Sequence, residues 1–187
     1  MQEFIDLIEK AKNVFDQRTA VRDQALVQAR QLTRLAAHTI RAIHRDEADT
    51  AQSLLSEARV LTLNIQRDLA SYPDVYYAGY TQDAIKEFAE ANLTVALILN
   101  QPMPTPEELG IEYAAYLNGL AETIGELRRK CLDILRQGYS EDAERLLASM
   151  DEIYNVLVTM DYPDAITNGL RRQTDLVRGI IERTRAD

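Results

Sequence analysis

Proline interrupts this chain at only three places, and that spacing limits which folds the sequence can adopt. The five prolines are Pro73, the group Pro102, Pro104 and Pro106, and Pro163. A residue that precedes proline disfavours the helical region, so helices are expected to end near these points. The segments between them carry apolar residues at helical spacing. Glycine is scarce and tryptophan is absent, which favours a helical protein over a β-sandwich or barrel.

The periodicity predicts an all-α bundle of six or seven helices, in one domain that spans residues 1–187. The expected long helices cover residues 2–45 (or two helices that join near 18–22), 48–71, 80–100, 112–136, 140–159 and 164–183. Thr105 and Ser140 have the character of N-caps, and Gly138 is typical of a left-handed C-terminal cap. Residues 72–80 and 101–110 are predicted connectors.

Two pairs of glutamates lie on apolar stretches of two different predicted helices. Glu87 and Glu90 are three residues apart, and Glu122 and Glu126 are four apart, so each pair projects from one side of its helix. Carboxylates in apolar surroundings need a counter-charge. If the two helices meet, the four acids form a cluster of the kind that holds Mg²⁺ or Mn²⁺, which prefer oxygen ligands.

A row of basic side chains follows one face of the first predicted helix. Arg30, Arg34, Arg41 and Arg45 fall within about 60° of one another at 100° per residue, and His38 lies beside them. The row is either a solvated helix face or a set of contacts to RNA phosphates. The net charge of −9 argues against a general nucleic-acid binder, so RNA binding requires that the basic residues gather on one surface.

The two acidic stretches resemble the translin superfamily, and they are closer to translin-associated factor X than to translin itself. Residues 87–91 fit the pattern E-F/Y-x-E-A, and residues 116–131 fit Y-L-x-G-L/V-A-D/E-x-x-G-E-L-x-R-x-C. The resemblance implies a translin-like helical bundle with the activity of a metal-dependent endoribonuclease that cleaves single-stranded RNA. It also implies single-stranded DNA as a further ligand class, and a closed homo-octamer that holds RNA inside.

The resemblance further implies that catalysis and binding of Mg²⁺ or Mn²⁺ belong to four acids, Glu87, Glu90, Glu122 and Glu126. Glu122 stands where the family usually has aspartate, and the added methylene would loosen the metal geometry. Glu126 is expected to be a metal ligand or the base that orients a water. Arg129 matches the family pattern and is either a phosphate contact or a salt-bridge partner of Glu126.

Three rival functions remain open. The first is an all-α, Mg²⁺-dependent nucleotide pyrophosphohydrolase, which also uses Glu-x-x-Glu on one helix but usually has a closer second acidic motif. The second is a translin-like protein that binds single-stranded RNA or DNA without cutting it, and the third is a structural helical module. Neither His38 nor His44 is spaced from a glutamate as Glu-x-x-His, which counts against a di-iron site. Cys131 has no evident activating base, which counts against nucleophilic catalysis.

Two further sets of residues have more than one interpretation. Tyr76, Tyr77 and Tyr80 either stack on bases or pack against the bundle. Apolar positions of the last predicted helix are either subunit contacts or core; they are Leu170, Leu176, Val177, Ile180 and Ile181. No apolar run is long enough to span a bilayer, no signal-peptide pattern follows Met1, and the single cysteine excludes an intramolecular disulfide. We therefore expect a cytoplasmic protein with no membrane partner.

Overall fold

The structure is a computed structural model that describes residues 1–186, so Asp187, the last residue of the expected domain, lies outside the described residues. The long helices are α1 (Gln2–His44), α2 (Ala48–Asp68), α4 (Gly79–Ile98), α6 (Tyr113–Leu135), α7 (Glu141–Leu157) and α9 (Leu170–Ala186). Three short helices lie in the connections: α3 (Pro73–Tyr76), α5 (Pro106–Leu109) and α8 (Asp164–Thr167). Residues 1–186 contain no β-strand, which confirms the all-α prediction.

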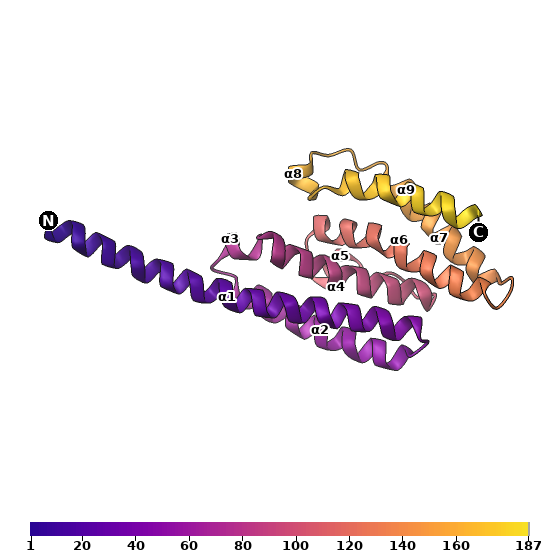
Figure 1. The fold of residues 1–187 in the computed structure, drawn as a ribbon, viewed down its shortest axis with the longest axis horizontal. Coiled ribbons are helices and arrows are strands. Elements are labelled where there is room, and N and C mark those ends of the chain that lie inside the picture. The colour runs from indigo at the N-terminus through magenta and orange to yellow at the C-terminus, as the bar shows by residue number, and fades with distance from the viewer. Residues whose placement is uncertain (187) are drawn as a thin grey trace.

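Helix α4 lies at the centre of the bundle (Figure 1). It packs against α1 on one side and α6 on the other, while α2 covers α1, and α7 and α9 cover α6. Ile85, Phe88 and Leu93 of α4 have no exposed surface. A helix that is apolar over most of its circumference is stable only in the interior of a protein. The acids Glu87 and Glu90 therefore come from the most enclosed helix of the fold.

Helices α4 and α6 approach each other closely at Gly119. A Cβ atom on Gly119 would lie 2.8 Å from the carbonyl oxygen of Lys86, 2.9 Å from Cβ of Ala89 and 3.0 Å from the backbone nitrogen of Glu90. Glycine is tolerated in a helix interior at a cost in stability, and here it permits a close backbone approach. The contact brings the helix that carries Glu122 alongside the helix that carries Glu90.

Helix α1 is continuous through residues 18–22, which decides between the two predicted alternatives in favour of one helix. Its N-terminal half projects away from the bundle (Figure 1), and Ala25 is the first of its residues to be buried. This arm exposes six large apolar side chains: Phe4, Ile5, Leu7, Ile8, Val14 and Phe15. Among residues 1–186, no helix combines the length and the apolar character that crossing a membrane requires.

The helix ends agree with the sequence predictions at two N-caps. Thr105 forms a capping box with Glu108, and the hydroxyl of Ser140 accepts a hydrogen bond from the backbone N–H of Asp142. Gly138 has a positive φ of 116°, although α6 already ends at Leu135. Both connectors contain a short helix; the predicted N-cap at Thr105 indicated the start of α5, whereas the sequence did not indicate α3.

Two predicted helices had wrong bounds. The helix predicted over 48–71 ends at Asp68, since the chain turns at Leu69, whose carbonyl accepts from the N–H of Tyr72 at 2.8 Å. The helix predicted over 164–183 is interrupted, and α8 and α9 replace it. Asn168 and Gly169 have φ values of 51° and 79°, and a left-handed backbone cannot continue a right-handed helix.

Candidate metal centre

Three glutamates from α4 and α6 meet at one point. One carboxylate oxygen from each of Glu87, Glu90 and Glu122 lies within 4.8 Å of the others. Glu90 is buried, whereas the other two are half-buried and open to a ligand. Three carboxylate oxygens are the donor set that Mg²⁺ and Mn²⁺ prefer. The cluster can therefore hold a divalent cation.

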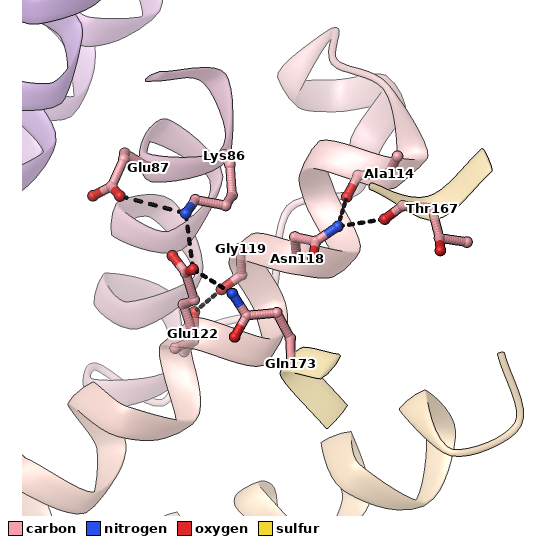
Figure 2. A network of polar contacts seen from close by, with 9 residues as sticks. Lys86, Glu87, Ala114, Asn118, Gly119, Glu122, Thr167 and Gln173 are labelled. Carbon is pink, nitrogen blue, oxygen red and sulfur yellow. Dashed lines mark hydrogen bonds and ion pairs between the residues drawn. The ribbon is translucent and has the colours of Figure 1, made fainter. Parts of the chain in front are cut away.

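Lys86 places a positive charge inside this cluster. Its Nζ lies 2.8 Å from Oε1 of Glu122 and 3.7 Å from Oε1 of Glu87, and Figure 2 shows the ammonium between the two carboxylates. Burial lowers the pKa of Lys86, but the hydrogen bond to Glu122 and the neighbouring negative charges outweigh burial, so the net pKa is raised. The lysine is therefore held in its charged form among the acids.

Glu90 is the acid that is most costly to ionise. Burial raises its pKa first, and the charges of Glu87, Glu122 and Glu126 raise it further, to about 8. Burial also raises the pKa of Glu87. A bound divalent cation would favour the ionised form of both carboxylates. Lys86 therefore offsets only part of the negative charge of the cluster, and a further cation would stabilise the ionised acids.

Glu126 lies beside the cluster but outside the group of three, and it is held by a histidine from α1. Nε2 of His44 is 2.5 Å from Oε2 of Glu126, across 82 residues of sequence. This hydrogen bond is the main cause of a lowered pKa at Glu126. Arg129 lies 3.7 Å from the same oxygen, so the salt bridge that was one of its two expected roles is present.

Glu122 is fixed from a third helix. Nε2 of Gln173, in the first turn of α9, donates to Oε1 of Glu122 at 2.9 Å, and Lys86 donates to the same oxygen (Figure 2). Asn118 donates to the carbonyl oxygen of Thr167 at 2.7 Å, which ties α8 to α6 nearby. Two donors on one oxygen restrict the glutamate side chain, which is longer than the aspartate usual in the family.

The arginine row consists of three exposed residues of α1 and Arg45, which caps its C-terminal end. Arg30, Arg34, Arg41 and Arg45 are all exposed, and within the described part of the chain none of them forms an ion pair. Arg41 and Arg45 flank His44, the histidine that contacts Glu126. The C-terminal end of the row therefore belongs to the part of α1 that contacts Glu126, and its charges are available to an anionic ligand.

The remaining candidate residues divide between core and surface. Tyr76 and Tyr80 pack against the core, whereas Tyr77 is 62% exposed. On α9, Leu176 is 56% exposed. The other apolar positions of that helix belong to the core or pack against it: Leu170, Val177, Ile180 and Ile181. Core packing therefore accounts for most of the positions that were also candidates for subunit contacts.

Three residues of this site had no signal in the sequence. His44, Lys86 and Gln173 each contact an acid from which they are separated by 36 residues or more. No spacing rule links such positions, because each contact depends on how two helices pack. Gly119 did have a signal, since glycine inside a helix is unfavourable and often marks a close approach.

Comparison with known proteins defines the class of this helical protein. No protein-family model matches the chain. An uncharacterized protein of Methanocaldococcus jannaschii, MJ0175, is 34% identical over 179 residues, which are 94% of this chain and 78% of the relative. The solved structure of AfC3PO in complex with duplex RNA has a TM-score of 0.88 at 32% identity, over 96% of this chain and 93% of that one. The crystal structure of AfC3PO gives 0.87 at 31% identity, with the same coverage.

These similarities extend over nearly the whole chain and include both helices that carry the acids. The fold is therefore that of the translin-like, all-helical proteins, of which the C3PO structures are examples. The chain belongs to the translin superfamily.

Proposed function

We propose that this chain is a divalent-metal-dependent endoribonuclease that cleaves single-stranded RNA. The observation that carries the proposal is the meeting of three carboxylates from two helices within 4.8 Å. Glu87, Glu90 and Glu122 would hold Mg²⁺ or Mn²⁺, with Glu126 as a fourth acid. The bound ion would lower the pKa of a coordinated water and offset charge on the scissile phosphate. The solved complex of AfC3PO with duplex RNA supports a nucleic acid as the ligand class.

Side chains around the proposed metal site would orient the attacking water, contact the phosphate and hold Glu122 in place. The lowered pKa of Glu126 keeps its carboxylate ionised, so this group would accept a hydrogen bond from the attacking water and orient it. Arg129 is exposed beside it and is placed to contact a phosphate oxygen. Gln173 and Lys86 hold Glu122 in one orientation.

The substrate is tested with end-labelled single-stranded RNA, single-stranded DNA, duplex RNA and a nucleoside triphosphate, each with Mg²⁺ and each with EDTA. We expect internal cleavage of single-stranded RNA in Mg²⁺, none in EDTA, and recovery when Mn²⁺ is added in excess. Hydrolysis of the triphosphate with RNA left intact would instead indicate a pyrophosphohydrolase. RNA that is bound but uncut would indicate a binding protein, and either result contradicts the proposal.

The RNA interface is proposed to consist of the arginine row of α1 together with Arg129. Phosphate contacts release counterions, so affinity should fall steeply as salt rises. We expect Arg41→Ala to weaken RNA binding regardless of sequence, and to reduce the slope of log affinity against log salt by about 0.7. Arg59→Ala is the matched control, because Arg59 is an exposed arginine of α2. Equal slopes for Arg41→Ala and Arg59→Ala, measured by fluorescence anisotropy, would exclude the row as the interface.

The chain is also proposed to assemble into a closed homo-octamer that holds RNA inside, in the cytoplasm. The projecting arm of α1 supports assembly, because it exposes apolar side chains such as Phe4 and Phe15 that an isolated chain leaves in water. A shell with a basic interior would reconcile the net charge of −9 with RNA binding. Native mass spectrometry should give eight times the 21.2 kDa mass of the chain, whereas a monomer or dimer would contradict the octamer.

A further inference from the structure

His44 connects the arginine-bearing helix to the acidic cluster. It lies in the last turn of α1, its side chain is 3% exposed, and its Nε2 is 2.5 Å from Oε2 of Glu126. Helix α1 packs mainly against α4 and α2, so α6 is not one of its main packing partners. A second polar contact spans the same gap, from Lys130 of α6 to Asp46 in the turn after α1, at 2.6 Å. Only the contact made by His44 reaches one of the four candidate acids, Glu126; the other involves Asp46.

The environment of His44 is unfavourable for a residue with a purely structural role. Its second ring nitrogen, Nδ1, is buried and has no hydrogen-bond partner among the described residues. A buried polar atom without a partner costs free energy, and an apolar side chain of similar volume would avoid that cost. The contact with Glu126 is therefore the feature of this position that requires a histidine.

The contact fixes one oxygen of Glu126 and leaves the other available. Both His44 and Arg129 approach Oε2 of Glu126, at 2.5 and 3.7 Å. Oε1 has no hydrogen-bond partner among the described residues. A carboxylate that is held by one oxygen has a defined orientation for the other, and hydrogen bonds of this kind determine how acids are presented to a metal ion.

We propose that His44 is a positioning residue, which holds Glu126 by Oε2 so that its carboxylate is presented in a fixed orientation to the Glu87, Glu90 and Glu122 cluster. This inference rests on the proposed function, because it assumes that the cluster takes a divalent cation. Since Arg41 and Arg45 flank His44, the same contact fixes the arginine row relative to the acids. Phosphates bound along α1 are then held at a set distance from the site of cleavage.

The experiment compares two polar substitutions that differ in reach. The amide nitrogen of glutamine lies where Nε2 of histidine does, so His44→Gln keeps a donor for Glu126. The amide nitrogen of asparagine lies nearer the position of Nδ1, so His44→Asn loses that donor. Binding of Mn²⁺ is measured by electron paramagnetic resonance of the free ion, and RNA cleavage is measured in parallel. Asp46→Asn is the control, because it weakens the neighbouring contact to Lys130 without touching Glu126.

We expect His44→Asn to weaken Mn²⁺ binding by about tenfold and to slow cleavage, with His44→Gln close to wild type. In a Glu126→Gln background, His44→Asn should have almost no further effect, because its action passes through Glu126. Asp46→Asn should leave Mn²⁺ affinity unchanged. A general loss of stability would affect His44→Asn and His44→Gln alike, so it would not explain a difference in Mn²⁺ affinity between them.

Two results would overturn the inference in distinguishable ways. If wild type binds Mn²⁺ and cuts RNA while His44→Asn does both equally well, His44 has no positioning role and the proposed function stands. The same conclusion follows if His44→Asn lowers affinity by the same factor with and without Glu126. If wild type neither binds Mn²⁺ nor cuts RNA, the proposed function itself fails, whatever the variants do.

Discussion

Glu90→Gln should make the metal-free protein more stable at pH 8 and should abolish its stabilisation by Mn²⁺. Glu90 is 8% exposed, and burial together with three neighbouring acids raises its pKa to about 8, against an ordinary value of 4.5. Ionisation of this buried group therefore opposes folding by an amount on the order of a few kcal/mol. Glutamine has nearly the same shape and no charge to bury, but it is a poorer ligand for a cation.

The raised pKa also fixes the sign of the pH dependence. Between pH 4.5 and 8 the folded chain keeps a proton on Glu90 that the unfolded chain has lost, so the free energy of unfolding falls as pH rises through this window. The fall should be largely absent in Glu90→Gln, with a remainder from Glu87, whose pKa is also raised. Below pH 4.5 both states hold the proton, and wild type and variant should converge.

Thermal unfolding at pH 5 and pH 8, with EDTA and with Mn²⁺, measures these effects. We expect the metal-free Glu90→Gln variant to unfold roughly 5 °C or more above wild type at pH 8. Glu57→Gln is the control, because Glu57 is an exposed acid of α2, a helix that carries none of the acids of the cluster. If Glu90→Gln were no more stable than wild type, and Mn²⁺ stabilised both equally, Glu90 would not belong to a cation site.

Gly119→Ala should destabilise the fold and disrupt the acidic cluster. The added Cβ would lie 2.8 Å from a backbone oxygen of α4 and 3.0 Å from the backbone nitrogen of Glu90. Backbone atoms cannot turn aside as a flexible side chain can, so α4 and α6 must move apart. Strain from an extra methyl group in a packed interior costs about 3 kcal/mol. The separation also displaces Glu122 from Glu90, so metal binding should weaken.

Gly125→Ala is the control for this effect, because the same helix there has open space. Apart from neighbouring backbone of the same helix, nothing lies within 4 Å of a Cβ placed on Gly125. Alanine is favoured over glycine in a helix interior by about 1 kcal/mol, so this variant should be slightly stabilised. The unfolding temperature of Gly119→Ala should fall by roughly 6–12 °C. Equal unfolding temperatures for the two variants would show that α4 and α6 are not in close contact.

Much of the fold could be predicted from the chain because its signals are local. Prolines at three places and apolar residues at helical spacing indicated the six long helices, and Thr105 and Ser140 were identified as N-caps by residue type. The interruption between α8 and α9 is not part of the predicted helix over 164–183, although Asn168 followed by Gly169 is a dipeptide typical of turns and both residues have a positive φ. Local patterns therefore gave the elements more reliably than their ends.

Local spacing also predicted part of the acidic cluster, namely the pairing of acids within each helix. Helical spacing places Glu87 with Glu90, and Glu122 with Glu126, but no local rule states that the two pairs meet. The structure brings three of the four together and holds Glu126 aside through His44. Contacts of that kind depend on how helices far apart in the chain pack, and one sequence carries no measure of that packing.

The measurement that tests the central claim most directly is cleavage of a labelled single-stranded RNA by wild type in Mg²⁺, by wild type in EDTA, and by Glu90→Gln in Mg²⁺. If Glu87, Glu90 and Glu122 form a catalytic metal centre, wild type will cut the RNA only in Mg²⁺. The folded Glu90→Gln variant will then bind the RNA and leave it intact. Cleavage by Glu90→Gln at the wild-type rate, or cleavage that persists in EDTA, would show that these acids do not form the catalytic centre.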